Sequence, residues 1–444
     1  MRGKSDSKKS ATQERGAAGE PRDPRPTRTT YVLIFLLALS LRGGWGAGRW
    51  ARSDQRAALE FPDEEQYWGM AGALRRGEGL KDELGFQATR MPLYPALLAP
   101  FTGSPNGILL ARSLHWVLGA LAAVLTAALA ARLHPRAGTI AGLLVALDPF
   151  LIFFSSSLLT ETAFVAALLA LWLALWNATR AKTLAPWIPV GLLAVVCVYL
   201  RESSAGLLLL GMGFVVVVRR FAKGAIAGAL LACGMIVLSL VPWAARNRAV
   251  TGDWCWLTHR GGISLYDGVR PGASGGSDLG EVKRSAAVRD FDEVAWDRYF
   301  WKEAVAVIRA EPGRVARLAL IKVGRMWNPV PNVETYRSAW ARAVSAGWSI
   351  PVFTLAVVGF FLVSIQWRGE GVRASLYLLL PALYFTALHS LFVGSVRYRL
   401  PAMPMVEILA AVAMAAAYNR RAAAPRSART RTTGASGAKG PHGH

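Results

Sequence analysis

The sequence predicts an all-α polytopic membrane protein with about ten transmembrane helices. Its 444 residues are 53% hydrophobic and carry a formal net charge of +23. Apolar runs of roughly 18 residues or more indicate membrane-spanning helices, and the chain contains several such runs. One soluble domain has no room to bury so many apolar helices, so the composition favours a polytopic membrane protein.

Two basic tails flank the expected transmembrane region. Residues 1–30 and 419–444 are rich in Ala, Gly, Ser, Thr and Pro, a composition that cannot bury enough apolar surface to fold. We expect both tails to be disordered and, by the positive-inside rule, cytoplasmic. Because so many basic residues lie in these tails, we expect no nucleic-acid partner. The N-terminus lacks a clear signal-peptide pattern, so residues 31–45 are interpreted as a retained first span.

The transmembrane domain is expected to cover residues 31–418. Alternation of the spans places the short basic loops 179–184, 219–223 and 367–373 in the cytoplasm and two longer polar regions, 46–105 and 246–347, outside. The expected spans are residues 31–45, 108–132, 138–154, 158–177, 186–200, 204–218, 224–243, 349–366, 374–394 and 401–418.

Cysteine and histidine usage gives no sign of a disulfide framework or a metal site. Cys197, Cys233 and Cys255 are scattered and lack CxxC spacing. The histidines show no metal-ligand spacing either, and we expect no metal and no other cofactor. The glycine-rich stretch 268–280 precedes no strand–helix unit, so it is interpreted as a flexible loop rather than a phosphate-binding loop.

The first outer region contains an acidic triplet, Asp63, Glu64 and Glu65, in the stretch FPDEEQYWGMAGAL. Apolar residues at helical spacing predict a short amphipathic helix over residues 63–74, with Pro62 in its first turn. The helix dipole favours acidic residues there, and this alone could explain Glu65. Asp63 and Glu64 remain candidates for a catalytic carboxylate at the membrane surface, where Asp63 could act as a general base. Tyr67 suits the membrane interface and is expected to line the site.

Arginines are expected at the same outer face. Arg90 precedes two prolines in TRMPLYPALL; it is either an anchor for lipid headgroups or a fixed cation for a phosphate. Tyr94 follows it and is expected to line the site. Other ionisable residues lie at the outer ends of predicted spans, where charge tends to mark function: Glu161, Arg201, Arg246, Arg397 and Arg399.

The order of these motifs resembles bacterial GT-C glycosyltransferases. The motifs are an outer DE pair, RxPLYP, a span-opening LTE, an LR hinge, PWxxRN and a terminal RYRLP, and the likeness extends over roughly residues 30–418. The segment 301–329 also resembles the helix–proline–helix that precedes the last spans in this superfamily. The most similar groups are the family 39 protein O-mannosyltransferase-like enzymes and the aminoarabinose transferases that modify lipid A.

The resemblance implies an inverting glycosyltransferase with a polyprenyl-phosphate sugar donor and an extracytoplasmic protein, glycan or lipid acceptor. It implies that Asp63 is the catalytic carboxylate and Glu64 its partner. It also implies an integral protein of the bacterial cytoplasmic (inner) membrane, with the active site on the outer face of that membrane. It also implies donor-phosphate contacts by Arg90, Arg201, Arg246, Arg397 and Arg399. Unlike some relatives, the sequence shows no large soluble domain after the last span, so we expect acceptor selection within the membrane domain and residues 246–347.

A polytopic transporter or polyprenyl-lipid flippase is the alternative function. Such a protein is expected to place charges or broken helices at mid-membrane, in related halves of the chain. Here no internal repeat is evident and the charges gather at the expected outer ends of the spans. This placement favours chemistry at the membrane surface.

Overall fold

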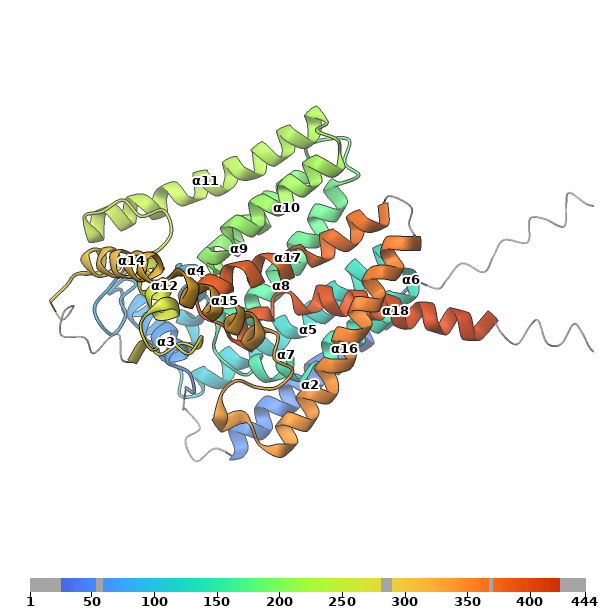
Figure 1. Ribbon diagram of the computed structural model, residues 1–444, viewed down its shortest axis with the longest axis horizontal. Coiled ribbons are helices and arrows are strands. Elements are labelled where there is room, and N and C mark those ends of the chain that lie inside the picture. The colour runs from blue at the N-terminus through green and yellow to red at the C-terminus, as the bar shows by residue number, and fades with distance from the viewer. Residues whose placement is uncertain (1–24, 53–58, 281–289, 367–369, 424–444) are drawn as a thin grey trace, which may run out of the picture.

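The computed structural model describes residues 25–52, 59–280, 290–366 and 370–423, and within these residues the regular elements are all helices (Figure 1). Six helices are long and apolar enough to cross a membrane: α2 (Arg28–Arg52), α5 (Gly107–Leu133), α8 (Thr160–Ala178), α11 (Lys223–Thr251), α16 (Ala339–Gln366) and α17 (Glu370–Leu391). Four shorter apolar helices complete the set: α6 (Pro135–Leu147), α9 (Trp187–Leu200), α10 (Ala205–Val218) and α18 (Met403–Ala423).

These helices follow the expected spans and confirm an all-α polytopic membrane protein. Their outward faces carry large apolar side chains, as lipid contact requires. Leu238 of α11 and Ile365 of α16 are 74% and 73% exposed on the isolated chain. Exposed apolar surface on this scale is a sign of contact with lipid or another protein rather than water.

The expected spans differ from the helices at several boundaries. The run 138–154 is divided at Asp148 and Pro149 into α6 and α7 (Pro149–Phe154), because proline supplies no amide hydrogen and Asp148 caps the new helix by accepting from the Leu151 amide at 2.8 Å. Helix α11 continues through PWAARN to Thr251, and Gly252, with φ of +76°, ends it. At the tails, α2 begins at Arg28 and α18 extends to Ala423; residues 1–24 and 424–444 lie outside the described residues.

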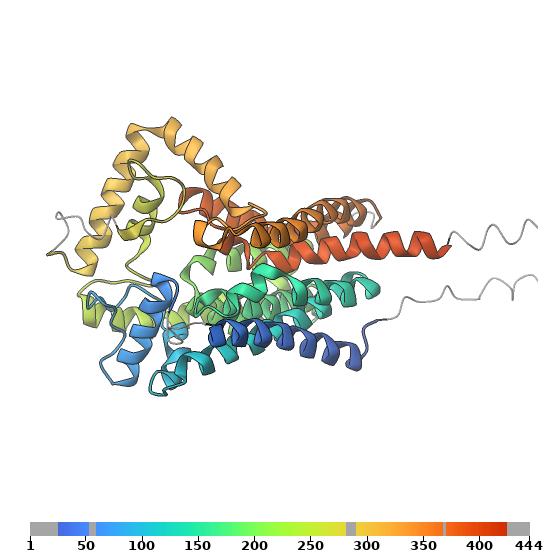
Figure 2. The ribbon, with the colours of Figure 1, turned by 90° about the horizontal axis from the view of Figure 1, so that it is seen from below.

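Smaller elements connect the apolar helices at one end of the bundle. They are α3 (Pro62–Arg75), α4 (Leu93–Leu98), η2 (Ala99–Phe101), η3 (Glu202–Ser204), α12 (Gly261–Val269), α14 (Glu293–Ala310), α15 (Pro312–Met326), η5 (Glu334–Tyr336) and η6 (Val396–Arg399). Figure 2 shows α3, α12 and α14 at the left, whereas the start of α2 and the end of α18 point to the right. The predicted helix over 63–74 therefore corresponds to α3, at the end of the bundle that also carries α12 and α14.

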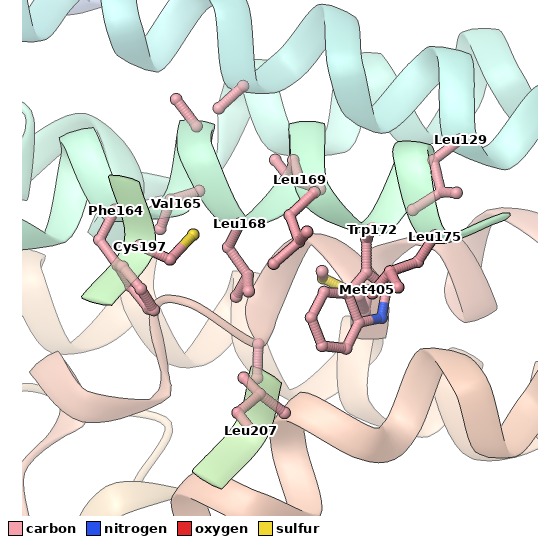
Figure 3. Close-up of a cluster of buried hydrophobic side chains, with 14 of the residues drawn as sticks. Leu129, Phe164, Val165, Leu168, Leu169, Trp172, Leu175, Cys197, Leu207 and Met405 are labelled. Carbon is pink, nitrogen blue, oxygen red and sulfur yellow. The ribbon is translucent and has the colours of Figure 1, made fainter. Parts of the chain in front are cut away.

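Helix α8 forms the centre of the bundle. In its most apolar window 78% of the residues are buried, and Figure 3 shows its side chains packed between those of α5, α9, α10 and α18. The Trp172 indole donates to the Tyr377 carbonyl at 3.1 Å, which satisfies its polar atom inside the core. Because α8 is fixed on several sides, its first turn, with Glu161, has a defined position at the connecting end.

Candidate active site

A cavity of about 1410 Å³ lies among the connecting elements. One part of its wall is apolar and is formed by α2, α7, η5 and the start of α16; it includes Leu41, Trp45, Phe150, Phe153, Phe154, Tyr336, Trp340 and Val344. The other part is polar and is formed by α3, η3, η6, α12 and the loop after α12. A ligand with both an apolar chain and a charged head could contact the two parts together.

Helix α3 carries Asp63 into the polar wall. Phe61 precedes the helix in an extended conformation and Pro62 occupies its first turn, where a missing amide hydrogen is tolerated. Glu64 secures this turn: its carboxylate accepts from the backbone amides of Glu60 at 2.8 Å and Phe61 at 3.1 Å, and from the amide of Leu158 before α8. The start of α3 is therefore bound to the start of α8.

Asp63 is an ionised carboxylate among three arginines. Its Oδ1 pairs with Arg90 and lies 3.7 Å from Arg260, and its Oδ2 lies 2.7 Å from Arg397. Burial acts to raise its pKa, but the positive charges of Arg90, Arg397 and Arg260 outweigh burial and hold the pKa well below its usual range. Its side chain is 23% exposed, so the carboxylate remains accessible from the cavity.

Glu161 forms a second ionic contact from the first turn of α8. Its Oε1 accepts from Arg397 at 2.5 Å and from Arg201 at 3.2 Å. Arg397 thus bridges Asp63 and Glu161, and α3, α8 and η6 meet at its guanidinium. Glu161 is buried behind the cavity wall, whereas Arg201 and Arg397 line it.

Arg90 is positioned by a polar network formed by side chains of residues 66–89. Its Nε donates to Gln66 at 2.8 Å and its Nη1 to the Tyr67 hydroxyl at 3.1 Å. Gln66 in turn donates to Asp82 at 3.1 Å, and Thr89 donates to the same Asp82 oxygen at 3.1 Å. Such a chain of hydrogen bonds fixes the guanidinium and limits the side-chain entropy lost when a ligand binds.

The structure brings most of the predicted site residues together. Asp63, Tyr67, Arg90, Arg201 and Arg397 line one cavity. Glu161 contacts two of them from behind. Glu64, expected beside Asp63 as its catalytic partner, instead faces away from the cavity and binds backbone amides.

Three other predicted site residues lie outside the cavity wall. Arg246 donates to the Gln87 carbonyl at 2.6 Å. Arg399 is fully buried and donates to the carbonyls of Met326 and Asn328. The Tyr94 hydroxyl is bonded to His115 at 3.0 Å, and its ring packs edge-on against Tyr67. These contacts stabilise the elements around the site, and each of the three side chains has a hydrogen-bond partner within the protein.

Arg260 is a site residue that sequence reasoning missed. It lies immediately before α12 in the segment LTHRGG, and its Nη1 donates to Gln66 at 3.2 Å besides pairing with Asp63. Burial and the adjacent Arg90 lower the pKa of Arg260. Its sequence signal is weak: a single arginine beside two glycines in a long polar region resembles an ordinary loop cation.

Asp63 and Glu161 contact guanidinium groups rather than one another. Among the residues that the structure describes, no group of three or more His, Cys, Asp or Glu side chains is placed to hold a metal ion. Arg397 lies between Asp63 and Glu161 and pairs with both. Such an arrangement of guanidinium groups can bind an anion beside the Asp63 carboxylate.

Comparison with solved structures identifies the fold. The chain is similar to AglB, an archaeal oligosaccharyltransferase from Archaeoglobus fulgidus solved with an inhibitory peptide and a dolichol-phosphate, with 13% identity and a TM-score of 0.57 over 92% of this chain and 52% of that chain. The apo form of the Archaeoglobus fulgidus oligosaccharyltransferase gives 14% identity and a TM-score of 0.56, with the same coverage. The chain therefore has the GT-C fold that its motifs resemble, and it spans about half the length of these proteins.

Other comparisons add little. ArnT from Cupriavidus metallidurans, solved bound to undecaprenyl phosphate, matches with 14% identity over 91% of this chain and 62% of that chain, but its TM-score of 0.41 is too low to establish a shared fold. No protein-family model and no curated protein matches the chain. The activity therefore has to be argued from the site.

Proposed function

We propose that this protein transfers a sugar from a polyprenyl-phosphate donor to an extracytoplasmic acceptor, with inversion at the sugar. The observation that carries the proposal is the single cavity in which an apolar aromatic wall adjoins a wall of arginines around Asp63. A polyprenyl phosphate has the same two parts, an apolar chain and an anionic head. The solved AglB, whose fold this chain shares, was bound to a dolichol-phosphate, which supports this class of donor.

The charge of the polar wall matches a phosphodiester. Four arginines face this centre, Arg90, Arg201, Arg260 and Arg397, and three carboxylates oppose them, Asp63, Glu161 and Glu202. One positive charge is left over, and a sugar linked through a phosphodiester carries one negative charge. Arginine suits this ligand because its planar group donates two parallel hydrogen bonds to phosphate oxygens.

The proposed reaction is a displacement at the anomeric carbon. A nucleophilic oxygen or nitrogen of the acceptor forms a bond to that carbon on the face opposite the phosphate. The bond from the carbon to the phosphate oxygen breaks, and its electron pair leaves with the polyprenyl phosphate. The proton of the nucleophile passes to a carboxylate oxygen of Asp63, and the arginines stabilise the charge that develops on the phosphate.

Donor binding is expected to make Asp63 a stronger base. With its pKa held far below the working pH, a carboxylate accepts protons poorly. The donor phosphate competes with Asp63 for the guanidinium groups of Arg90 and Arg397. When the phosphate takes some of these hydrogen bonds, fewer positive charges act on Asp63, and its pKa rises toward the ordinary value.

The first prediction tests the carboxylate. Asp63→Asn should leave the protein folded and membrane-inserted but lower sugar transfer by about 10²-fold or more, the usual effect of losing a general base. The measurement uses purified protein with a panel of undecaprenyl-phosphate hexoses and with cell-envelope protein, glycan and lipid fractions as acceptors, and mass spectrometry follows the release of undecaprenyl phosphate.

Glu65→Gln is the matched control, because Glu65 lies in the same first turn of α3 and is exposed. It should retain activity. Wild-type rates in the Asp63→Asn protein would remove Asp63 from the mechanism. Binding of the lipid by the wild type without any cleavage would favour the flippase alternative.

A further inference from the structure

The cavity wall contains a further arginine, Arg325, which is not among the ion-pair partners of Asp63. Arg325 projects from the last turn of α15, and its Nε donates to the Gly394 carbonyl at 3.2 Å. Within the described part of the chain, it forms no ion pair with a carboxylate. Burial lowers the pKa of its guanidinium, and no neighbouring acid opposes that effect. An arginine left half-buried without a counter-ion is unusual unless a ligand supplies one.

The glycine-rich loop after α12 forms the other side of this position. A Cβ atom on Gly276 would lie 2.7 Å from Nη2 of Arg325, so only glycine lets the backbone approach the guanidinium this closely. Ser274 and Ser277 of the same loop also line the cavity. The Ser274 hydroxyl makes no hydrogen bond to any residue that the structure describes, and it is available to a ligand.

The loop is anchored, in contrast to the flexible loop expected from the sequence. Asp267 accepts from the Ser277 hydroxyl at 2.7 Å and from the Asp278 amide at 3.0 Å. Arg314 of α15 donates to the carbonyls of Val269 and Arg270, and the Gly394 amide donates to the Gly275 carbonyl at 2.8 Å. The loop is thus fixed against α15 and against the segment that leads to Arg397.

We infer that Arg325 and residues 274–277 form a second anion-binding subsite, which takes a phosphate or carboxylate group of the acceptor. This inference rests on the proposed function. The donor phosphate already matches the surplus charge of the Asp63 centre, whereas no carboxylate among the described residues pairs with Arg325. The subsite is built by α15 and by the loop, not by the apolar wall that would hold a polyprenyl chain.

The two anion subsites lie in the same cavity. Gly394, which accepts from Arg325, precedes Arg397 by three residues, and three residues span at most about 11 Å between Cα atoms. An acceptor that extends along the cavity from Arg325 to Asp63 would have its acidic group bound at the first residue and its nucleophile at the second. The subsite would select acidic acceptors over neutral ones and would hold them in position for attack.

The experiment measures two affinities on the full-length protein in phosphatidylcholine nanodiscs at low ionic strength. Undecaprenyl phosphate is titrated first, and inorganic phosphate is titrated with and without saturating undecaprenyl phosphate. Wild-type protein should bind both ligands together. Arg325→Gln should weaken inorganic phosphate binding about tenfold or more, the worth of a charge-assisted hydrogen bond, and should leave the affinity for undecaprenyl phosphate unchanged.

Two further variants separate charge from geometry. Arg317→Gln removes an exposed arginine of the same helix that does not line the cavity, and it should change neither affinity. Gly276→Ala keeps the charge of Arg325 but displaces its guanidinium. It should weaken the binding of inorganic phosphate and leave the affinity for undecaprenyl phosphate unchanged.

Two results would overturn the inference. Equal inorganic phosphate binding by wild type and Arg325→Gln would show that there is no such subsite. If Arg325→Gln weakened the binding of both ligands equally, and undecaprenyl phosphate displaced inorganic phosphate from the wild type, Arg325 would belong to the donor subsite. Failure of the wild type to bind undecaprenyl phosphate would count against the proposed function instead, since inorganic phosphate is also titrated alone.

Discussion

Asp63 and Glu64 are adjacent in the sequence but have different roles in the structure. The side chain of Asp63 enters the cavity and meets guanidinium groups, whereas that of Glu64 is fully buried and meets backbone amides. Burial raises the pKa of Glu64, although its hydrogen bonds act in the opposite direction. Only Asp63 is therefore placed to contact a substrate, and Glu64 acts by fixing the turn that carries it.

The pH dependence expected for the proposed reaction follows from the ionisation state of Asp63. Its pKa is held well below the ordinary value of about 3.9, so the carboxylate stays ionised in the free protein as the pH falls. Because kcat/KM reports the ionisation of free enzyme and substrate, it should change little between about pH 7 and about pH 5. Rates of undecaprenyl phosphate release across this interval provide the measurement. If kcat/KM instead fell at acid pH with a midpoint near pH 6, and this fall came from Asp63, the arginines would not be depressing the pKa of Asp63.

Which residues form the site could be predicted only in part. The charges of Arg90, Arg201 and Arg397 stand out in the sequence because each interrupts or borders an apolar run, and all three line the cavity. Arg246 and Arg399 give the same signal, yet they bind carbonyls elsewhere. The side to which a guanidinium turns depends on tertiary contacts between distant segments, and neither spacing nor hydropathy reports those contacts.

Among the elements, the apolar helices were predictable. A segment that crosses lipid must be a long apolar run whose backbone N–H and C=O groups form hydrogen bonds within the segment. The connecting elements were not predictable, since polar segments obey no such constraint. The loop after α12 is an example: its composition suggests flexibility, whereas side chains from α12 and α15 hold it. Asp267, buried near the end of α12, binds both a hydroxyl and an amide of this loop.

Asp267→Asn should loosen the loop without unfolding the bundle. An amide oxygen is neutral and cannot match a carboxylate in holding the Ser277 hydroxyl and the Asp278 amide, so about 1.5–3 kcal/mol of local stability should be lost. Hydrogen exchange of amides 274–278 should become faster, and inorganic phosphate binding should weaken in step. Asp278→Asn is the control, because the Asp278 side chain is 61% exposed in its pair with Arg270 and surface pairs contribute little. Similar exchange rates in the two variants would show that Asp267 does not hold the loop.

At the scale of the whole molecule, the fold gathers functional groups from distant parts of the chain at one end of the bundle. Connections between successive apolar helices alternate between the two ends, so every second connection contributes to the cavity. Those connections contain α3, α7, η3, α12 and its loop, and η6. The opposite connections are short and basic, including Arg180, Lys182, Arg219 and Arg220, as expected for a cytoplasmic face.

This arrangement predicts the orientation of the cavity in the membrane. In a variant without the three native cysteines, Glu65→Cys should react with a membrane-impermeant maleimide in intact cells. Thr183→Cys should react only after the cells are permeabilised. Both positions are exposed on the chain, so a difference in labelling reports the side of the membrane rather than burial. Position 65 lies on the first turn of α3 beside the cavity, and position 183 lies in the connection between α8 and α9. Labelling of position 183 but not of position 65 in intact cells would place the arginine cluster in the cytoplasm, where an extracytoplasmic acceptor could not reach it.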